Sequence, residues 1–240
     1  MPTSRAPTAP QMTRAVHDAG SPERAAVLLR YFRTGPGEYA EGDHFVGATA
    51  PQIRKLARKF RDAPLKEIDT LLRSPVHEVR SLALLLLVEK FRAGDKMQQQ
   101  RIYELYIRRT TFINNWDLVD VSAPHIVGAW LFDRSRAPLL KLARSTSLWE
   151  RRIAILATQH FIRHGQLEAT FRIADMLLAD SHDLIHKAVG LMLREAGNRD
   201  PAAERAFLAS RYMRMPRTML RYAIEKFPEK ERRAYLKGQA

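Results

Sequence analysis

The stretch Val-Arg-Ser-Leu-Ala-Leu-Leu-Leu-Leu at residues 79–87 decides the fold class. Its apolar side chains recur every three or four residues, the spacing that gathers them on one face of a helix. Two later stretches follow the same rule: Ile153, Leu156, Ala157 and His160, and then Leu184, Ala188, Leu191 and Met192. No stretch shows the sustained alternation of apolar and polar residues that is typical of a half-buried strand. The sequence therefore predicts an all-α fold.

A weak internal repeat runs through these helices. In each unit a basic group lies just before an alanine, as in Arg80–Ala83, Arg151–Ala154, His186–Ala188 and Arg221–Ala223. The alanines lie 71, 34 and 35 residues apart, and 71 is close to two periods. A period of roughly 35–45 residues is typical of solenoids built from paired helices. We expect basic side chains on the concave face, or alternatively salt bridges between repeats.

The ends of the predicted elements follow from proline and glycine. Residues 1–20 carry Pro2, Pro7 and Pro10 among small polar residues, which predicts a disordered tail. Ser21-Pro22-Glu23 is a typical helix start, and this helix should run to about Thr34. The glycine-rich stretch 34–50 predicts a long loop, after which Pro51 opens the next helix. Residues 21–240 should form one repeat domain.

Charge gives the first indication of function. Forty Lys and Arg residues oppose 26 Asp and Glu residues, leaving a net charge of +14. Such a surplus favours a polyanionic partner, most commonly nucleic acid, although basic faces without a partner are the alternative. The chain has no cysteine, which excludes disulfides and thiol nucleophiles. No apolar run reaches the roughly 18 residues of a membrane span, so we expect a cytoplasmic protein without membrane contact.

The repeat unit near residue 119 departs from this basic pattern. It reads Asn114-Asn115-Trp116-Asp117-Leu118-Val119-Asp120, with acidic residues where the other units are basic. Trp116 and Asp120 are four residues apart and share one face of a helix. A cationic ligand would explain them. Alternatively, Asp117 or Asp120 pairs with a nearby arginine and Trp116 belongs to the core.

Two other patterns carry less weight. His160 and His164 have the spacing of a helical metal pair, but no third ligand of suitable spacing accompanies them, so we expect no metal. The glycines at 35–47 lack the Gly-Lys-Ser/Thr ending of a phosphate-binding loop. We therefore expect no nucleotide cofactor.

Taken in order, several segments resemble the AlkD-like DNA alkylation repair family, the HEAT-like alkylpurine DNA glycosylases. The similarity covers about residues 22–236. Its segments are Gly37–Asp43 with Gly47, Pro51–Arg54, Asn115–Asp120, Trp149–Ala154, Lys187–Gly190 with Leu193–Glu195, and Pro216–Thr218 with Leu220–Ile224.

The resemblance implies a right-handed superhelix of HEAT-like antiparallel helix pairs with a concave basic DNA-binding face. It implies excision of cationic N3- or N7-alkylated purines from duplex DNA in base-excision repair, without a metal or cofactor and without extrusion of the damaged base. By family motif, Asp120 is the catalytic carboxylate, and Trp116 and Arg152 border the lesion. We expect a monomer that associates with the nucleoid when it binds alkylated DNA.

One residue departs from the family pattern. The segment after Gly190 usually begins with tryptophan, whereas this chain has Leu191. The alternative is therefore a weakly active or non-catalytic HEAT-like protein that binds bent, branched or damaged DNA, unless another aromatic residue such as Tyr222 takes the role. The remaining candidate DNA-binding residues are Tyr39, Arg80, Arg151, Lys187, Leu191, Arg194, Arg217 and Arg221.

Overall fold

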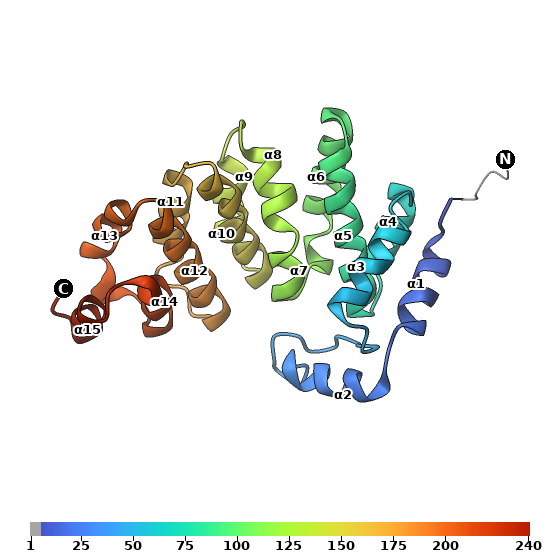
Figure 1. Cartoon of the computed structure of the whole chain (residues 1–240), viewed down its shortest axis with the longest axis horizontal. Helices are drawn as coiled ribbons and strands as arrows, with labels where there is room; N and C mark the ends of the chain where they lie inside the picture. Colours follow the sequence, from blue (N-terminus) through green and yellow to red (C-terminus); the bar gives the residue numbers. More distant parts are fainter. Residues whose placement is uncertain (1–5) are drawn as a thin grey trace. The chain divides into compact units, whose positions relative to one another are not determined.

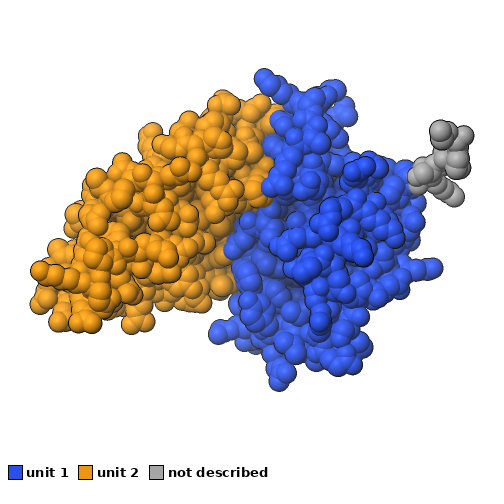
Figure 2. Space-filling view, viewed as in Figure 1, with its two compact units in different colours: residues 1–122 blue, residues 123–240 orange. Residues whose placement is uncertain are grey.

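The computed structural model describes residues 6–240, and its regular elements are all helices. The one pairing of extended backbone among these residues is an isolated bridge between His44 and Val76. The chain divides into two compact units, one ending at Ser122 and the other running from Ala123 to Ala240 (Figure 2). Among the described helices, none combines the length and the apolar character needed to cross a bilayer. The predicted all-α class is confirmed.

The first unit is built around one buried helix. Its elements are α1 (Ala9–Asp18), α2 (Pro22–Tyr31), α3 (Ala50–Lys59), α4 (Leu65–Leu72), α5 (His77–Ala93), α6 (Lys96–Arg108), η1 (Thr110–Phe112) and α7 (Trp116–Asp120) (Figure 1). Helix α5 contacts α3, α4, α6, α7 and α1. Because it is surrounded by other helices, α5 is apolar on nearly every side, and Leu82, Ala83 and Leu86 are fully buried.

The predicted disordered tail is wrong over residues 9–18, which form α1. Met12 and Val16 of α1 are fully buried, and the helix packs on α3, α4 and α5. Its first amide, that of Ala9, donates a hydrogen bond of 2.7 Å to Glu67. Pro10 does not interrupt the helix because the first turn of a helix has no backbone partner for that amide. Residues 1–5 of the predicted tail lie outside the described part of the chain.

Helix α2 begins at Pro22 as predicted, with the Ser21 side chain accepting from the amide of Arg24. It ends at Tyr31, and Arg33 then adopts a left-handed backbone conformation with a φ of 52°. In the following loop, Gly47 has a φ of 82° and passes so close to α2 that a β-carbon would lie 2.1 Å from the carbonyl oxygen of Ser21. A glycine is therefore required at position 47.

The second unit repeats the same packing with two central helices. Its elements are η2 (Pro124–Gly128), α8 (Ala129–Leu131), α9 (Ala137–Ala143), α10 (Leu148–Arg163), α11 (Glu168–Met176), α12 (Asp183–Arg199), α13 (Pro201–Ala209), η3 (Tyr212–Arg214), α14 (Arg217–Ala223), η4 (Ile224–Lys226) and α15 (Glu229–Lys237). Helix α12 lies against both α10 and α14. A β-carbon on Gly190 would lie 2.5 Å from the carbonyl oxygen of Met219, so the α12–α14 contact requires glycine there.

These helix contacts explain why alanine recurs at one position of each repeat. Ala154, Ala188 and Ala223 are fully buried in the second unit, as Ala83 is in the first. A small side chain at each position lets neighbouring helices approach closely. The superhelical solenoid itself stays a prediction.

Candidate active site

The candidate site centres on α7, a helix of only five residues that carries both Trp116 and Asp120. Asn115 caps its start: the side chain is fully buried, and its oxygen accepts from the Trp116 amide at 2.8 Å. The Asp117 carboxylate accepts from the amide of Leu118 at 2.9 Å. These two bonds satisfy amides that a helix start leaves without partners.

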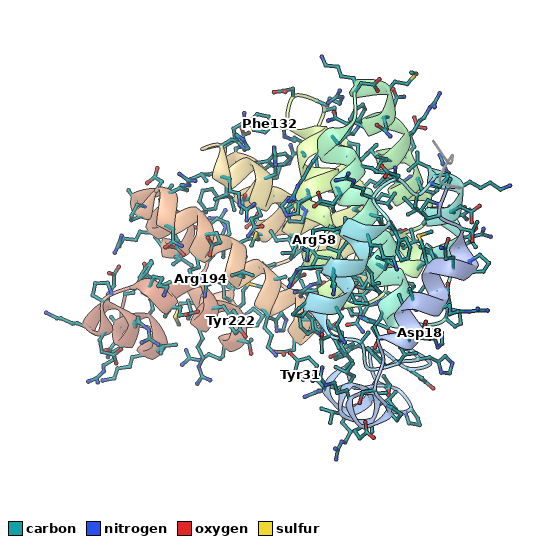
Figure 3. The ribbon with its side chains drawn as sticks, turned by 45° about the vertical axis from the view of Figure 1, so that its right-hand side comes forward. Asp18, Tyr31, Arg58, Phe132, Arg194 and Tyr222 are labelled. Carbon is teal, nitrogen blue, oxygen red and sulfur yellow. The ribbon has the colours of Figure 1, made fainter. Side chains whose placement is uncertain are left out.

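Trp116 belongs to an aromatic group that reaches the surface. Its ring stacks on Phe32 with centroids 5.4 Å apart, and Tyr31 meets it edge-on at 6.0 Å. Phe32 is buried, whereas Tyr31 at the end of α2 is 61% exposed (Figure 3). Trp116 itself is partly exposed. Trp116 is therefore not a fully buried core residue.

Tyr39, a predicted DNA-binding residue, joins this group from the loop after α2. Burial raises the pKa of Tyr39, although a side-chain hydrogen bond with Trp116 acts in the opposite direction. Tyr39 therefore helps to hold the indole ring. The sequence makes Tyr39 a candidate DNA-binding residue but does not predict its contact with Trp116.

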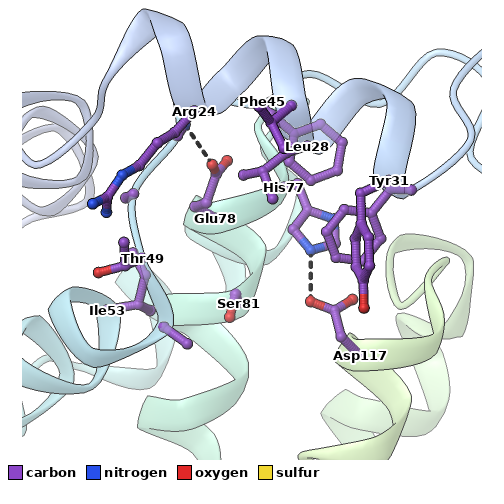
Figure 4. Close-up of a pocket in the computed structure, with 15 residues that line it drawn as sticks. Arg24, Leu28, Tyr31, Phe45, Thr49, Ile53, His77, Glu78, Ser81 and Asp117 are labelled. Atoms are coloured by element: carbon purple, nitrogen blue, oxygen red, sulfur yellow. Dashed lines mark hydrogen bonds and ion pairs between the residues drawn. The ribbon is translucent and has the colours of Figure 1, made fainter.

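A buried ionic network lies directly behind the start of α7. His77 is 2% exposed, and its Nε2 lies 2.9 Å from Asp117 (Figure 4). Its Nδ1 lies 3.3 Å from Asp43. Asp43 also accepts from Arg80 at 2.6 Å and from the Asn115 amide nitrogen at 3.4 Å. Burial alone would lower the pKa of His77, but the hydrogen bonds to Asp117 and Asp43 raise it to about 9.

This network gives Asp117 a structural partner. The alternative interpretation of the sequence paired Asp117 or Asp120 with an arginine, whereas Asp117 pairs with His77. His77 itself was missed in the sequence, because its partners lie 34 residues before it and 40 residues after it. The one local signal is the polar pair His77-Glu78 at the start of an otherwise apolar helix.

The other end of α7 is also anchored. The Ser122 hydroxyl donates to the carbonyl oxygen of Leu118 at 2.5 Å, and the fully buried Tyr106 hydroxyl lies 2.9 Å from Ser122. Burial raises the pKa of Tyr106, and the charge of Asp120 raises it further. Asp120, which is partly exposed, therefore lies close enough to Tyr106 to influence it electrostatically. Both ends of the short helix are fixed to the body of the unit.

A cavity of about 560 Å³ adjoins the network in the first unit. Its walls come mainly from apolar side chains of α2 and the loop after it, including Leu28, Tyr31 and Phe45, with His77 and Asp117 at one end (Figure 4). None of the residues of α2 is buried, and Val27 is 55% exposed. The helix thus presents an apolar side next to Trp116.

The structure reassigns Arg80 from the predicted DNA-binding groove to the interior. Its side chain is 4% exposed and donates to Asp43 and to the carbonyl oxygens of Ser74 and Pro75. A guanidinium in this position has no surface to offer to a phosphate. The burial counts against a direct contact of Arg80 with a phosphate, because the first half of α5 is enclosed by neighbouring elements.

In the second unit, Arg152 is 5% exposed and donates to the carbonyl oxygen of Leu184 at 2.6 Å. This contact ties α10 to the first turn of α12. The burial favours a supporting role for Arg152 over direct contact with a phosphate.

Three further basic candidates of the second unit form ion pairs. Arg151 pairs with Asp180 at 2.6 Å, Lys187 with Asp183 at 2.7 Å, and Arg194 with Glu225. Arg151 of α10 thus reaches the segment between α11 and α12, and Arg194 of α12 reaches η4, which fits the alternative interpretation of the repeat as a set of salt bridges. Two remaining candidates, Arg217 and Arg221, are exposed, and no ion pair involves them within residues 6–240.

Leu191 is partly exposed on α12. Tyr222 of α14 lies beside the preceding residue, since a β-carbon on Gly190 would be 2.5 Å from the Tyr222 β-carbon. The Tyr222 side chain is 36% exposed (Figure 3). Tyr222 is therefore an aromatic residue whose β-carbon lies beside Gly190, one residue before Leu191.

No group of three or more histidine, cysteine or carboxylate side chains could hold a metal ion within residues 6–240. His160 and His164 have ring centroids 4.5 Å apart, and Phe132 packs on both. Burial and the neighbouring positive groups lower the pKa of His160 to about 4.

Comparison with known proteins shows the family of the chain. The model of the DNA alkylation repair enzyme family matches residues 12–227. A solved structure described as a predicted DNA alkylation repair enzyme from Enterococcus faecalis superposes with a TM-score of 0.68 at 16% identity, over 88% of this chain and 97% of that one. No curated protein matches the chain. The family match spans most of the sequence, and this chain is a member of the DNA alkylation repair enzyme family.

Proposed function

We propose that this protein is a DNA glycosylase that removes cationic N3- or N7-alkylated purines from duplex DNA. The observation that carries the proposal is the anchored helix α7, which holds an aromatic ring and a carboxylate on one face. Cation–π attraction to Trp116 and charge attraction to Asp120 both favour a positively charged ligand. The family gives the repair context, and the net charge of +14 suits a DNA partner.

The reaction needs little from the protein. Alkylation at N3 or N7 gives the purine a positive charge, so the purine takes the electron pair of the breaking C1′–N9 bond and leaves as a neutral base. Positive charge then moves to the deoxyribose, where the fixed carboxylate of Asp120 stabilises the oxocarbenium-like species. A water molecule oriented by Asp120 adds its oxygen to C1′ and gives up a proton to the surrounding solvent. No strong general acid is required, because the leaving group is already activated.

The damaged base would stay stacked during this reaction, with the protein acting as a monomer on duplex DNA. Arg217 and Arg221 are the strongest of the predicted phosphate contacts, because their side chains are exposed. Lys187 would have to exchange its ion pair with Asp183 for a phosphate, which costs little because both side chains are exposed. The same exchange is costlier for Arg151, since its partner Asp180 is 6% exposed and would be left without a counter-charge. Arg152 would act by shaping the start of α12.

The test is release of free base from duplex DNA carrying 7-methylguanine or 3-methyladenine. We expect release by the wild type and a loss of at least about a hundredfold in Asp120→Asn, since removal of one electrostatic stabiliser has that effect in other enzymes. Asp120→Asn should retain DNA binding. Asp62→Asn is the matched control, because Asp62 is a highly exposed carboxylate of the same unit. Equal rates for Asp120→Asn and the control would refute the role of Asp120.

Leu191 favours a second function, which is binding to bent, branched or damaged DNA without chemistry. An aliphatic side chain can pack against a sugar but offers no ring face to a cation. This alternative predicts no base release by the wild type, together with DNA binding that weakens steeply as salt rises.

A further inference from the structure

We propose that His77 is a positioning residue, which as a buried imidazolium between Asp43 and Asp117 sets the placement of Trp116 and Asp120. Its consequence for catalysis rests on the function proposed above, whereas its protonation and its effect on α7 do not.

The geometry of the bridge requires two protons on the ring. Nδ1 faces a carboxylate oxygen of Asp43 at 3.3 Å, and Nε2 faces one of Asp117 at 2.9 Å. An ionised carboxylate only accepts hydrogen bonds, so both ring nitrogens must donate, and only the imidazolium form can do this. The high pKa of His77, about 9, agrees with this requirement.

The surrounding charges balance only when His77 is protonated. Asp43 and Asp117 carry two negative charges, and Arg80 supplies one positive charge through its 2.6 Å contact with Asp43. The neighbouring Glu78 is directed elsewhere, accepting from the amides of Val46 and Gly47 at 3.1 and 2.7 Å. Loss of the imidazolium proton would therefore leave a net negative charge in a site that is 2% exposed at His77.

Three contacts couple the protonation of His77 to the position of α7. Asp117 follows Trp116 directly in the chain and belongs to the same short helix. Asp43 also accepts from Asn115, whose side chain caps that helix. Phe32 lies between the two rings, 5.0 Å from His77 and 5.4 Å from Trp116. A change at His77 therefore reaches the cap, the first turn and the aromatic contact of the helix together.

The first experiment measures the protonation of His77 directly, by nitrogen chemical shifts of the imidazole rings in the ¹⁵N-labelled full chain. His77→Gln assigns the signal among the eight histidines. We expect two protonated ring nitrogens at pH 7.5 and an apparent pKa near 9. A measured pKa of His77 at or below the ordinary value of 6.5 would overturn the proposal. This result does not depend on whether the protein releases bases.

The second experiment measures base release between pH 7 and 9.5, with spontaneous release subtracted. We expect His77→Gln to lower the maximal rate about 10- to 100-fold while changing DNA affinity little, as misplacement of a reacting group does. The wild-type rate should fall as pH approaches 9, whereas the lower rate of His77→Gln should not. His77→Arg keeps a permanent charge and two donors, so it should restore part of the rate without the alkaline decline.

Leu71→Ala controls for loss of stability alone, because Leu71 is a buried residue of α4 outside the network. An equal loss of rate in Leu71→Ala, or an unchanged alkaline decline in His77→Gln, would overturn the positioning role. If the wild type releases no base at all, the proposed glycosylase function fails. The nitrogen titration then decides the state of His77 by itself.

Discussion

Replacing Asp43 by asparagine tests how much the first unit depends on its buried network. Asp43 is 7% exposed and accepts from His77, Arg80 and Asn115. The substitution keeps the shape of the side chain but removes the charge that balances two buried cations. Breaking a buried ion pair by removing one partner costs about 3–5 kcal/mol. Since the asparagine oxygen can still accept one hydrogen bond, we expect about 3 kcal/mol of lost stability.

The assay is urea unfolding of the full chain at pH 7, followed by the fluorescence of Trp116 in a Trp130→Phe, Trp149→Phe background. Trp116 then reports the first unit alone, because the other two tryptophans lie in the second. A loss of 3 kcal/mol would be a large part of the roughly 5–15 kcal/mol that stabilises a typical domain.

Asp69→Asn is the matched control for this substitution. Asp69 also pairs with an arginine, Arg109, at 2.7 Å, but the two side chains are 22% and 33% exposed. A pair near the surface contributes about 0–1 kcal/mol. If Asp43→Asn loses no more stability than Asp69→Asn, the argument that the network is a buried and strongly coupled unit is refuted.

Three further predictions concern the second unit. Gly190→Ala should destabilise it by about 1–3 kcal/mol, since the new methyl group overpacks the α12–α14 contact; thermal unfolding measures this, and a stability equal to the wild type would contradict the packing. Burial raises the pKa of Glu204 to about 8, above its unfolded value of 4.5, so its contribution to stability is present below pH 4.5 and is lost as pH rises through 8. Urea unfolding at pH 5 and pH 9 should therefore show that Glu204→Gln is more stable than the wild type only at pH 9. The expected gain is a few kcal/mol, at about 1.4 kcal/mol per pKa unit. An equal difference in unfolding free energy between the two proteins at both pH values would contradict this. Leu191→Trp should increase base release from 7-methylguanine DNA several-fold through the added cation–π contact, and an unchanged rate would indicate that Tyr222 or another group already fills this role.

The helices were predictable because helical spacing is local. Leu82, Ala83 and Leu86 repeat every three or four residues, and the structure buries all three in α5. The prediction of disorder over α1 is wrong because prolines among small polar residues outweigh the apolar positions Ala9, Met12 and Val16, which have the same spacing. A proline in the first turn carries no information against a helix.

The network behind the site could not be predicted in this way. Asp43, His77 and Asp117 come from a loop and two helices, and no short-range pattern relates them. Arg80 illustrates the same limit: the repeat placed a basic residue there, but only the enclosed position of α5 turns that residue inward. The similarity to the family predicts roles for Trp116 and Asp120, whereas the contacts that hold these two residues are visible only in the tertiary structure.

A helix of five residues has too few internal hydrogen bonds to be stable by itself, because forming its first turn is unfavourable. The geometry of Trp116 and Asp120 is therefore set from outside α7, by Asn115 and the His77 network at one end and by Tyr106 and Ser122 at the other. Buried ions are a costly way to stabilise a fold compared with apolar packing. Their presence directly behind α7 is explained if they fix one placement of the helix, so a substitution in the network should reduce activity more than its effect on stability would require.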